Sequence, residues 1–428
     1  MPACRMVAVP ADRYYRYRLS EKEVMPIAES VIDQIVEALT KPVAPEEANP
    51  PQAEVDQQND IITAKAANFS AAAEEINRIF LEKRWSDGLP IVPPTRDLVD
   101  QMLKGTSRSA DEVIGKVSPK NGIATIEKIA INAVMAGAKP EYLPVIIAAM
   151  EGLVDDNFDL THMQASTGSF LPAIIVAGPI AKELNFNSGI GMLGHGWRAN
   201  ATVGRSIRLA LLNLGQTWPA DNDMALTGRT SSYTFYTFAN DDDRDPWEPD
   251  HVNRGFKPGD NTVTVSTVGG QFRALGGGAV AFWTAQGILD NIVANVGGPS
   301  RYLNCMKYII VFHPDCAAEL AKMGHTRASV QEWIYEQTRV PVSRLNAGMV
   351  QFVKRMIEDG RIRPEHVDVF KQALEKGGKL PVVQGPEDFH VYVAGGSPGY
   401  SLFFSYPGLN YGHEVRKITN AALTENGK

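Results

Sequence analysis

Residues 173–205, AIIVAGPIAKELNFNSGIGMLGHGWRANATVGR, contain in order a strand, a glycine-rich loop and the start of a helix. The run Ala173–Ala177 is continuously apolar and rich in β-branched residues, which is typical of a strand buried on both faces. Five glycines then fall between Gly189 and Gly204, and a helix-forming run, Thr202–Asn213, follows. A strand, a loop and a helix in succession form the basic unit of an α/β fold.

Further strands and helices alternate along the rest of the chain. Strands are also expected at Tyr233–Ala239, Thr262–Thr267, Tyr308–Phe312 and His390–Ala394. Helices are expected at Ser20–Leu39, at 61–83, from Ala124, at Tyr142–Met150 and over most of 315–376. Because the two kinds of element interleave, we predict a mixed α/β fold with buried strands.

The length of 428 residues is enough for two or three domains. We predict an N-terminal helical arm with a proline-rich linker at 1–60, a core α/β domain at 61–300, and a C-terminal α/β region at 301–428. An arm of this kind is expected to pack on the body or on a partner subunit, which is consistent with a homo-oligomer.

Composition excludes several classes of protein. The chain is 44% hydrophobic and 21% charged, as in ordinary globular proteins, and its net charge of −7 argues against a general nucleic-acid binder. No apolar run reaches the roughly 18 residues that cross a membrane, and the first residues contain no hydrophobic signal core. The three cysteines, Cys4, Cys305 and Cys316, are odd in number and lack metal spacing, so we expect no disulfide framework. We therefore expect a cytoplasmic protein.

The glycine-rich loop is the predicted substrate site. Gly194 and Gly196 let a ligand approach the main chain closely, and the free N–H groups of a helix start attract anions. Arg198 and Arg205 add guanidinium groups that fit a carboxylate or a phosphate, and Asn200 lies between them. This pattern predicts a site for a small anionic organic substrate.

The residue in this loop that could act as an acid or a base is His195, which has a glycine on each side. Its alternative role is to cap the turn. Glu127, in the first turn of a predicted helix, and Asp87, in an Asp-Gly pair, are the candidate carboxylate counterparts. Each has a structural alternative, since acidic residues are common at helix starts and in turns.

Two further segments supply candidate substrate contacts. The prolines of Trp85-Ser-Asp-Gly-Leu-Pro-Ile-Val-Pro-Pro-Thr95 predict a fixed loop that is neither helix nor central strand. Such a loop either holds functional residues, with Trp85 among them, or locks a domain edge. His162 belongs to a run rich in hydroxyl and amide groups, 159–168, which either orients a polar ligand or satisfies neighbouring elements.

The sequence identifies no cofactor. The Walker phosphate-binding sequence, the His-x-x-x-His spacing of a helical zinc site and the Cys-x-x-Cys pair are all absent. Folding could still assemble a metal site from dispersed histidines such as His162, His195 and His413, so a metal-dependent hydrolase stays an alternative.

Four segments resemble a bacterial family that is associated with UGSC-type thiol/selenoproteins. They are Trp85–Thr95, Ile131–Pro144, Arg198–Arg205 and Pro246–Pro249. The resemblance covers roughly residues 80–260 and implies a multi-component enzyme, in which this chain binds the substrate and a small partner protein supplies a reactive cysteine or selenocysteine. The chain has no UGSC or CGSC sequence of its own.

We therefore expect an enzyme or enzyme subunit that acts on a small organic anion by acid–base chemistry. The reaction would be a lyase-like elimination or a thiol-assisted reductive cleavage. The alternative from a different class is a non-catalytic binding subunit of a multi-component complex.

Overall fold

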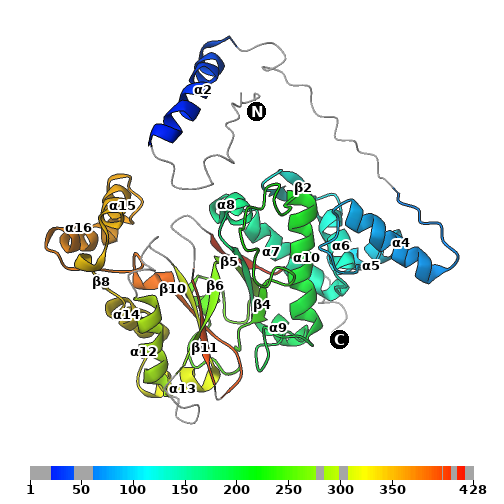
Figure 1. The fold of residues 1–428 in the computed structure, drawn as a ribbon. Helices are drawn as coiled ribbons and strands as arrows, with labels where there is room; N and C mark the ends of the chain where they lie inside the picture. The colour runs from blue at the N-terminus through cyan, green and yellow to red at the C-terminus, as the bar shows by residue number, and fades with distance from the viewer. Residues whose placement is uncertain are drawn as a thin grey trace. The chain divides into compact units, whose positions relative to one another are not determined.

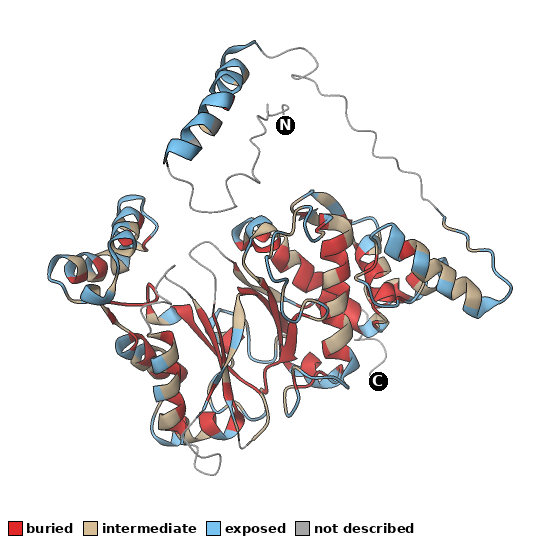
Figure 2. Ribbon diagram, viewed as in Figure 1, coloured by how far each residue is buried: buried red, intermediate tan, exposed pale blue. Residues whose placement is uncertain are grey.

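The computed structural model describes residues 21–42, 61–275, 284–297, 307–397, 399–405 and 412–419 (Figure 1). The chain divides into two compact units, Met1–Thr63 and Ala64–Lys428. In the first unit the described element is helix α2 (Glu21–Thr40), most of whose residues are exposed (Figure 2). Helices make up 45% and strands 16% of the structure, and the two interleave, which confirms the predicted α/β class.

The second unit contains two four-stranded sheets that pack face to face (Figure 1). The first sheet has the order β12 (His413–Lys417), β5 (Thr262–Val268), β3 (Leu171–Ala177), β4 (Tyr236–Ala239). The second sheet has the order β10 (Phe389–Val393), β7 (Tyr308–Phe312), β11 (Ser401–Ser405), β6 (Gly270–Ala274). Parallel pairing joins β3 to β4 and β7 to β10, and the other neighbours are antiparallel.

The continuous apolar runs follow from burial on both faces of each sheet. In the second sheet Ile309 and Phe404 belong to the core shared with the first sheet, whereas Tyr308 and Phe403 belong to the core on the opposite face. Successive side chains of a strand point to opposite faces, so a strand buried on both sides needs apolar residues throughout. Figure 2 shows this burial as two adjacent layers of buried strands.

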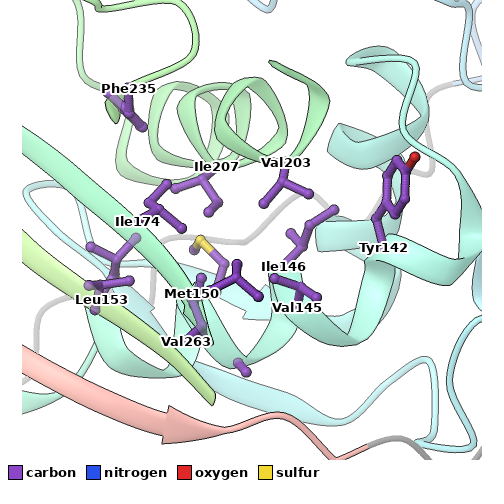
Figure 3. Packing of buried hydrophobic residues seen from close by; sticks show 14 of the residues in the cluster. Tyr142, Val145, Ile146, Met150, Leu153, Ile174, Val203, Ile207, Phe235 and Val263 are labelled. Carbon is purple, nitrogen blue, oxygen red and sulfur yellow. The ribbon is translucent and has the colours of Figure 1, made fainter. Parts of the chain in front are cut away.

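Helices cover the outer face of each sheet. On the first sheet α7 (Leu143–Leu153) packs against β5 and β12, and α10 (Arg198–Gly215) packs against β4 and α6 (Ile126–Met135). Figure 3 shows Ile146 and Met150 of α7 meeting Val203 and Ile207 of α10, close to Ile174 of β3. The second sheet is covered by α12 (Ala285–Val296), α13 (Pro314–Lys322) and α14 (Arg327–Gln337).

The remaining described elements surround these four layers. The helices are α4 (Phe69–Glu82), α5 (Arg96–Leu103), α8 (Leu160–Ala165), α9 (Pro179–Glu183), α11 (Asp250–Asn253), α15 (Ala347–Glu358) and α16 (Val367–Glu375). Two small two-stranded sheets are formed by β1 (Val113–Val117) with β2 (Gly122–Thr125), and by β8 (Val340–Pro341) with β9 (Lys379–Leu380). Short 3-10 turns occupy Pro140–Tyr142, Asp156–Phe158, Val342–Arg344, Pro364–His366 and Pro386–Asp388.

Most of the predicted elements are confirmed, with shifted boundaries. All five predicted strands exist, and the predicted loop at 85–95 is neither helix nor strand. The helix expected at 61–83 begins only at Phe69, where the Asn68 side chain accepts a hydrogen bond from the Ala71 N–H at 3.0 Å. Helix α10 begins at Arg198, four residues before the predicted Thr202, so part of the glycine-rich segment is helical.

Residue 300, predicted as a domain boundary, does not separate the two sheets. Strand β12, from the predicted C-terminal region, pairs with β5 in the first sheet, and β6, from the predicted core, pairs with β11 in the second. The physical reason is that each sheet completes its hydrogen bonding with strands from both sides of this residue.

None of the described helices combines the length and the apolar character that are needed to cross a bilayer.

At Gly204, α10 packs closely against β4 and the residues that precede it. A Cβ atom at this position would lie 1.8 Å from the carbonyl oxygen of Thr234 and 2.5 Å from Oγ1 of Thr237. Helix propensity alone favours alanine over glycine by about 1 kcal/mol. We predict the opposite sign here: Gly204→Ala should lower the free energy of unfolding by at least about 3 kcal/mol in urea denaturation, because backbone atoms must move.

Gly189→Ala is the control for this substitution, since the nearest atoms to its Cβ would be 3.6 and 3.8 Å away. This variant should stay within about 0.5 kcal/mol of the wild type. Equal stabilities of the two variants would contradict the close packing of α10 on β4.

Candidate functional site

The glycine-rich loop before α10 is fastened to the helix by Asn200. This side chain is 4% exposed, and its Oδ1 accepts a hydrogen bond from the Asn187 N–H at 2.8 Å. Its Nδ2 donates to the carbonyl oxygens of Asn187, Met192 and Thr237 at 3.0 to 3.1 Å. We predicted Asn200 as a substrate ligand, but a buried amide must satisfy its polar atoms, and here the backbone does so.

Arg205 and Asp87 meet in a two-fold ion pair. Nε of Arg205 lies 2.9 Å from Oδ2 of Asp87, and Nη2 lies 2.9 Å from Oδ1, with 15% and 4% of the respective side chains exposed. Nη2 also donates to the carbonyl oxygens of Leu89 and Pro90 at 3.2 and 2.9 Å. This pair ties the 85–95 loop to α10, so both charges are used within the protein instead of at a substrate or at His195.

Trp85 contributes to the same anchoring. Its ring makes an edge contact with Phe80 at 5.4 Å, and its carbonyl oxygen accepts a hydrogen bond from Asn213 at 3.1 Å. The loop therefore locks onto the body of the unit, which is the structural alternative weighed for it from the sequence.

The other predicted charged residues take local partners. Glu127 pairs with Arg96 at 2.7 Å on the surface, and Arg198 donates to the carbonyl oxygen of Gly137 at 2.8 and 3.0 Å. The His162 ring lies 2.7 Å from the carboxylate of Asp159, with 71% of its side chain exposed. The structure thus brings Asp87 and Arg205 together, and gives the remaining residues separate partners.

His195, Gly194 and Gly196 lie exposed on the loop. Gly196 has φ of +104°, and nothing lies within 4 Å of the position that a Cβ would take, so the loop is open at this point. The geometry leaves the imidazole of His195 accessible, and its catalytic role stays a prediction.

A second group of polar residues lies between the two sheets, at the end where β7, β10 and β12 begin. The rings of His390 and His413 stack with their centroids 3.7 Å apart and their planes at 12°. Oγ of Ser266 lies 2.5 Å from Nδ1 of His413, and Nη2 of Arg254 lies 2.8 Å from Nδ1 of His390. We call these residues, with Asp250, Tyr392 and Lys307, the inter-sheet cluster.

Strand register explains why the two histidines meet. His413 of β12 pairs with Ser266 of β5, which pairs with Ala173 of β3, so these residues lie in one row across the first sheet. In the second sheet His390 pairs with Ile309, and Ile309 pairs with Phe404. Because the Phe404 ring packs on Tyr236 of the first sheet at 4.9 Å, both rows face the space between the sheets.

Asp250 joins the cluster through two hydrogen bonds to one carboxylate oxygen. Its Oδ2 accepts from Nε of Arg254 at 2.6 Å and from the hydroxyl of Tyr392 at 3.2 Å. Asp250 is 9% exposed and Tyr392 2% exposed, whereas 28% of the Arg254 side chain reaches solvent. The cluster is therefore buried at Tyr392 and accessible at Arg254.

The environment keeps both stacked imidazoles neutral. Burial lowers the pKa of His390 and of His413 well below the usual range, and the positive charges of Arg254 and Lys307 act in the same direction. The geometry agrees, because a guanidinium only donates hydrogen bonds and Nδ1 of His390 must accept. Burial also lowers the pKa of Lys307. The cluster thus combines two neutral bases with cationic groups.

Sequence reasoning did not single out this cluster as a site. Its available signal was one polar residue in an otherwise apolar strand, Phe389-His-Val-Tyr-Val393. His413 was considered only as a metal ligand together with His162 and His195, but those two are exposed whereas His413 stacks on His390. Among the described residues, the one group with metal-ligand spacing is Glu365, His366 and Glu387, at the surface.

The segment Gly395-Gly-Ser-Pro-Gly399 has the Gly-x-Ser-x-Gly spacing of a hydrolase nucleophile turn. Its context differs, because the segment connects β10 to β11 and no helix follows it. The Ser397 hydroxyl accepts a hydrogen bond from the Asp315 N–H at 3.4 Å. The expected strand–turn–helix arrangement of a serine hydrolase is thus not formed here.

The ion pair between Arg205 and Asp87 leads to a stability prediction. Asp87→Ala should lower the free energy of unfolding by roughly 3 kcal/mol in urea denaturation, because it leaves the Arg205 charge without its buried partner. Glu127→Ala is the control: it breaks a surface pair with Arg96 and should cost less than about 1 kcal/mol. A small effect of both substitutions would show that the 85–95 loop is not held by this pair.

The two stacked histidines lead to a prediction on pH. In the unfolded chain they bind protons with pKa values near the usual 6.5, whereas the folded protein keeps them neutral at lower pH. Below about pH 6.5 the unfolded state binds more protons, so stability should fall by up to about 1.4 kcal/mol per pH unit for each histidine.

Urea denaturation at pH 7.5 and pH 5.5 measures this dependence. His390→Asn and His413→Asn should each reduce the difference between the two pH values, because one proton-binding group is removed from the unfolded state. His195→Asn, at an exposed position, is the control and should keep the wild-type difference. Unchanged pH dependence in both cluster variants would rule out their burial as neutral groups.

Comparison with known proteins gives no match to a protein-family model, to a curated protein or to a solved structure. The resemblance to the UGSC-associated family therefore stays a prediction.

Proposed function

We propose that this chain is an enzyme, or the substrate-binding subunit of an enzyme, that acts on a small organic anion by acid–base chemistry at the inter-sheet cluster. The observation that carries the proposal is the pair of neutral, stacked imidazoles of His390 and His413 beside the cationic Arg254 and Lys307. Titratable groups whose pKa values are displaced by burial and by specific charges are typical of reacting centres.

The cationic groups support binding of an anion. One carboxylate, that of Asp250, hydrogen-bonds Arg254 in the cluster, and Lys307 adds a second, half-buried positive charge. Arg254, with 28% of its side chain exposed, would meet a carboxylate or phosphate group of a substrate that enters from solvent.

The histidines supply the base. If Nδ1 of His413 donates to Oγ of Ser266, the lone pair of His413 lies on Nε2, where it can accept a proton from a carbon next to the substrate carboxylate. The electron pair of the broken C–H bond forms a C=C bond as the neighbouring substituent leaves with its own bonding pair. Arg254 and Lys307 would stabilise the negative charge that develops on the carboxylate.

The described residues favour this elimination over a thiol-assisted reductive cleavage. Cys316 is buried, and burial raises the pKa of its thiol to about 12, so it is not a thiolate at neutral pH. Cys4 and Cys305 lie outside the described residues. A reductive reaction would therefore draw its thiol or selenol from those residues or from a small partner protein, as the family resemblance implies. We also propose that the protein is located in the cytoplasm and forms a homo-oligomer.

The test is proton exchange in D2O, followed by ¹H NMR with a panel of 2-hydroxy, 2-amino and 3-hydroxy carboxylates. We expect the wild-type protein to exchange the proton next to the carboxylate of at least one compound, and to eliminate its substituent. His413→Gln should reduce the rate by at least about 100-fold, as expected for loss of a general base. Arg254→Gln should mainly raise KM.

His195→Gln separates this proposal from the loop first predicted as the site. If the reaction takes place at the inter-sheet cluster, this variant keeps the wild-type rate. Loss of the rate in His195→Gln with a normal rate in His413→Gln would overturn the proposal and return the reaction to the glycine-rich loop. Binding of these compounds without exchange would favour the non-catalytic subunit.

A further inference from the structure

Lys307 is the lysine of the inter-sheet cluster, and its position directs it toward the two histidines. It lies immediately before β7, and Ile309, two positions later, packs in the core between the sheets. Because side chains two positions apart along a strand point to the same face, Lys307 faces the space that holds His390 and His413. Its charge acts on both imidazoles. The amine is therefore a half-buried member of this polar group.

The two carboxylates that act on Lys307 are bound by arginines. Asp388 accepts hydrogen bonds from Nη1 and Nη2 of Arg363 at 3.0 and 2.8 Å, and Glu414 pairs with Arg416 at 2.8 Å. Within the described part of the chain, the Lys307 side chain forms no salt bridge and no hydrogen bond. This lysine has thus lost part of its contact with water without gaining a partner of opposite charge.

This environment favours the neutral amine. Burial lowers the pKa of Lys307, and the guanidinium groups of Arg363 and Arg254 add to this effect. The carboxylates of Asp388 and Glu414 act in the opposite direction without cancelling the shift. At neutral pH a larger share of Lys307 is therefore unprotonated than of an ordinary lysine, whose pKa is about 10.4. Lysines that are desolvated beside another cation are activated as nucleophiles.

We propose that Lys307 forms a Schiff base with the carbonyl group of a small oxo acid. The amine nitrogen bonds to the carbonyl carbon, and the carbonyl oxygen leaves as water with the two amine protons. The imine nitrogen then takes one proton from solvent and becomes an iminium. The choice of an oxo acid rests on the proposed function, because Arg254 would bind its carboxylate. The covalent step itself depends only on Lys307.

The iminium would extend the acid–base chemistry of the cluster. Its positive charge replaces that of the ammonium group and withdraws electrons from the neighbouring carbon. When a base removes a proton from that carbon, the electron pair of the C–H bond forms a C=C bond and the C=N pair moves to nitrogen, which gives an enamine. His413 is the base already proposed for a proton in this position.

Reductive trapping tests the covalent step. The full chain is incubated with pyruvate or acetoacetate and sodium cyanoborohydride, and the modified lysines are identified by peptide mapping with mass spectrometry. We expect a secondary amine to form at Lys307 at least about tenfold faster than at any exposed lysine. Lys307→Arg keeps the positive charge and should lose this fast modification. Lys354→Arg replaces an exposed lysine and should keep it.

The pH dependence of trapping in the wild type makes the test independent of misfolded variants. Each lysine reacts as its neutral amine, and the pKa of Lys307 is lowered. The ratio of modification at Lys307 to modification at Lys354 should therefore fall as the pH is raised from 7 to 9. A constant ratio, or a Lys307 that reacts no faster than Lys354 at pH 7, would overturn the proposal.

The Schiff base and the proposed function can fail separately. Arg254→Gln should raise the pyruvate concentration for half-maximal trapping at least about tenfold, and should alter the trapping of acetone, which has no carboxylate, much less. Equal trapping of pyruvate in Arg254→Gln and in the wild type would support the reactive amine and contradict the anion site. Proton exchange by the wild type without any trapping at Lys307 would overturn the covalent step alone.

Discussion

The packing of two sheets against each other is the constraint on which the second unit depends. Each sheet has a helical layer on its other face, so β3 and β7 are enclosed on both sides and carry apolar residues at every position. The contacts of Tyr236 and Phe238 on β4 with Phe404 on β11 join the two sheets. Polar side chains that enter this space need hydrogen-bond partners, because burial removes most of their contact with water.

The inter-sheet cluster satisfies this requirement by pairing residues that belong to different elements. Ser266 and His413 connect β5 to β12, and Arg254 connects the end of α11 to His390 on β10. The stacked rings then connect the two sheets. The same enclosure that demands these partners also removes water from the imidazoles and keeps them neutral. Burial between the sheets therefore accounts both for the hydrogen-bond partners of these side chains and for the neutral state of the imidazoles.

The glycine-rich loop shows how a sequence pattern can have two physical meanings. Glycines before a helix, with arginines and an asparagine in its first turns, are suited to an anion, but they are equally suited to holding a loop on the helix. In this protein Asn200 and Arg205 do the latter, because their partners, the loop backbone and Asp87, lie within hydrogen-bonding distance. The residue types indicate the available hydrogen bonds, and only the folded chain decides whether a ligand or the protein supplies the partner.

The sequence by itself determined the type and the approximate position of the strongly patterned elements. Continuous apolar runs identified β3 and β7, and the prolines of 85–95 excluded a helix, because these effects act between neighbouring residues. The short strands β6, β11 and β12 were missed, since five residues carry little pattern and their partners lie elsewhere in the chain. The tertiary structure alone decided which distant residues meet: Arg205 with Asp87 across 118 positions, Arg254 with His390 across 136, and Ser266 with His413 across 147. These contacts depend on how strands are ordered in a sheet and on which faces are covered, and neither is encoded in the spacing of nearby residues.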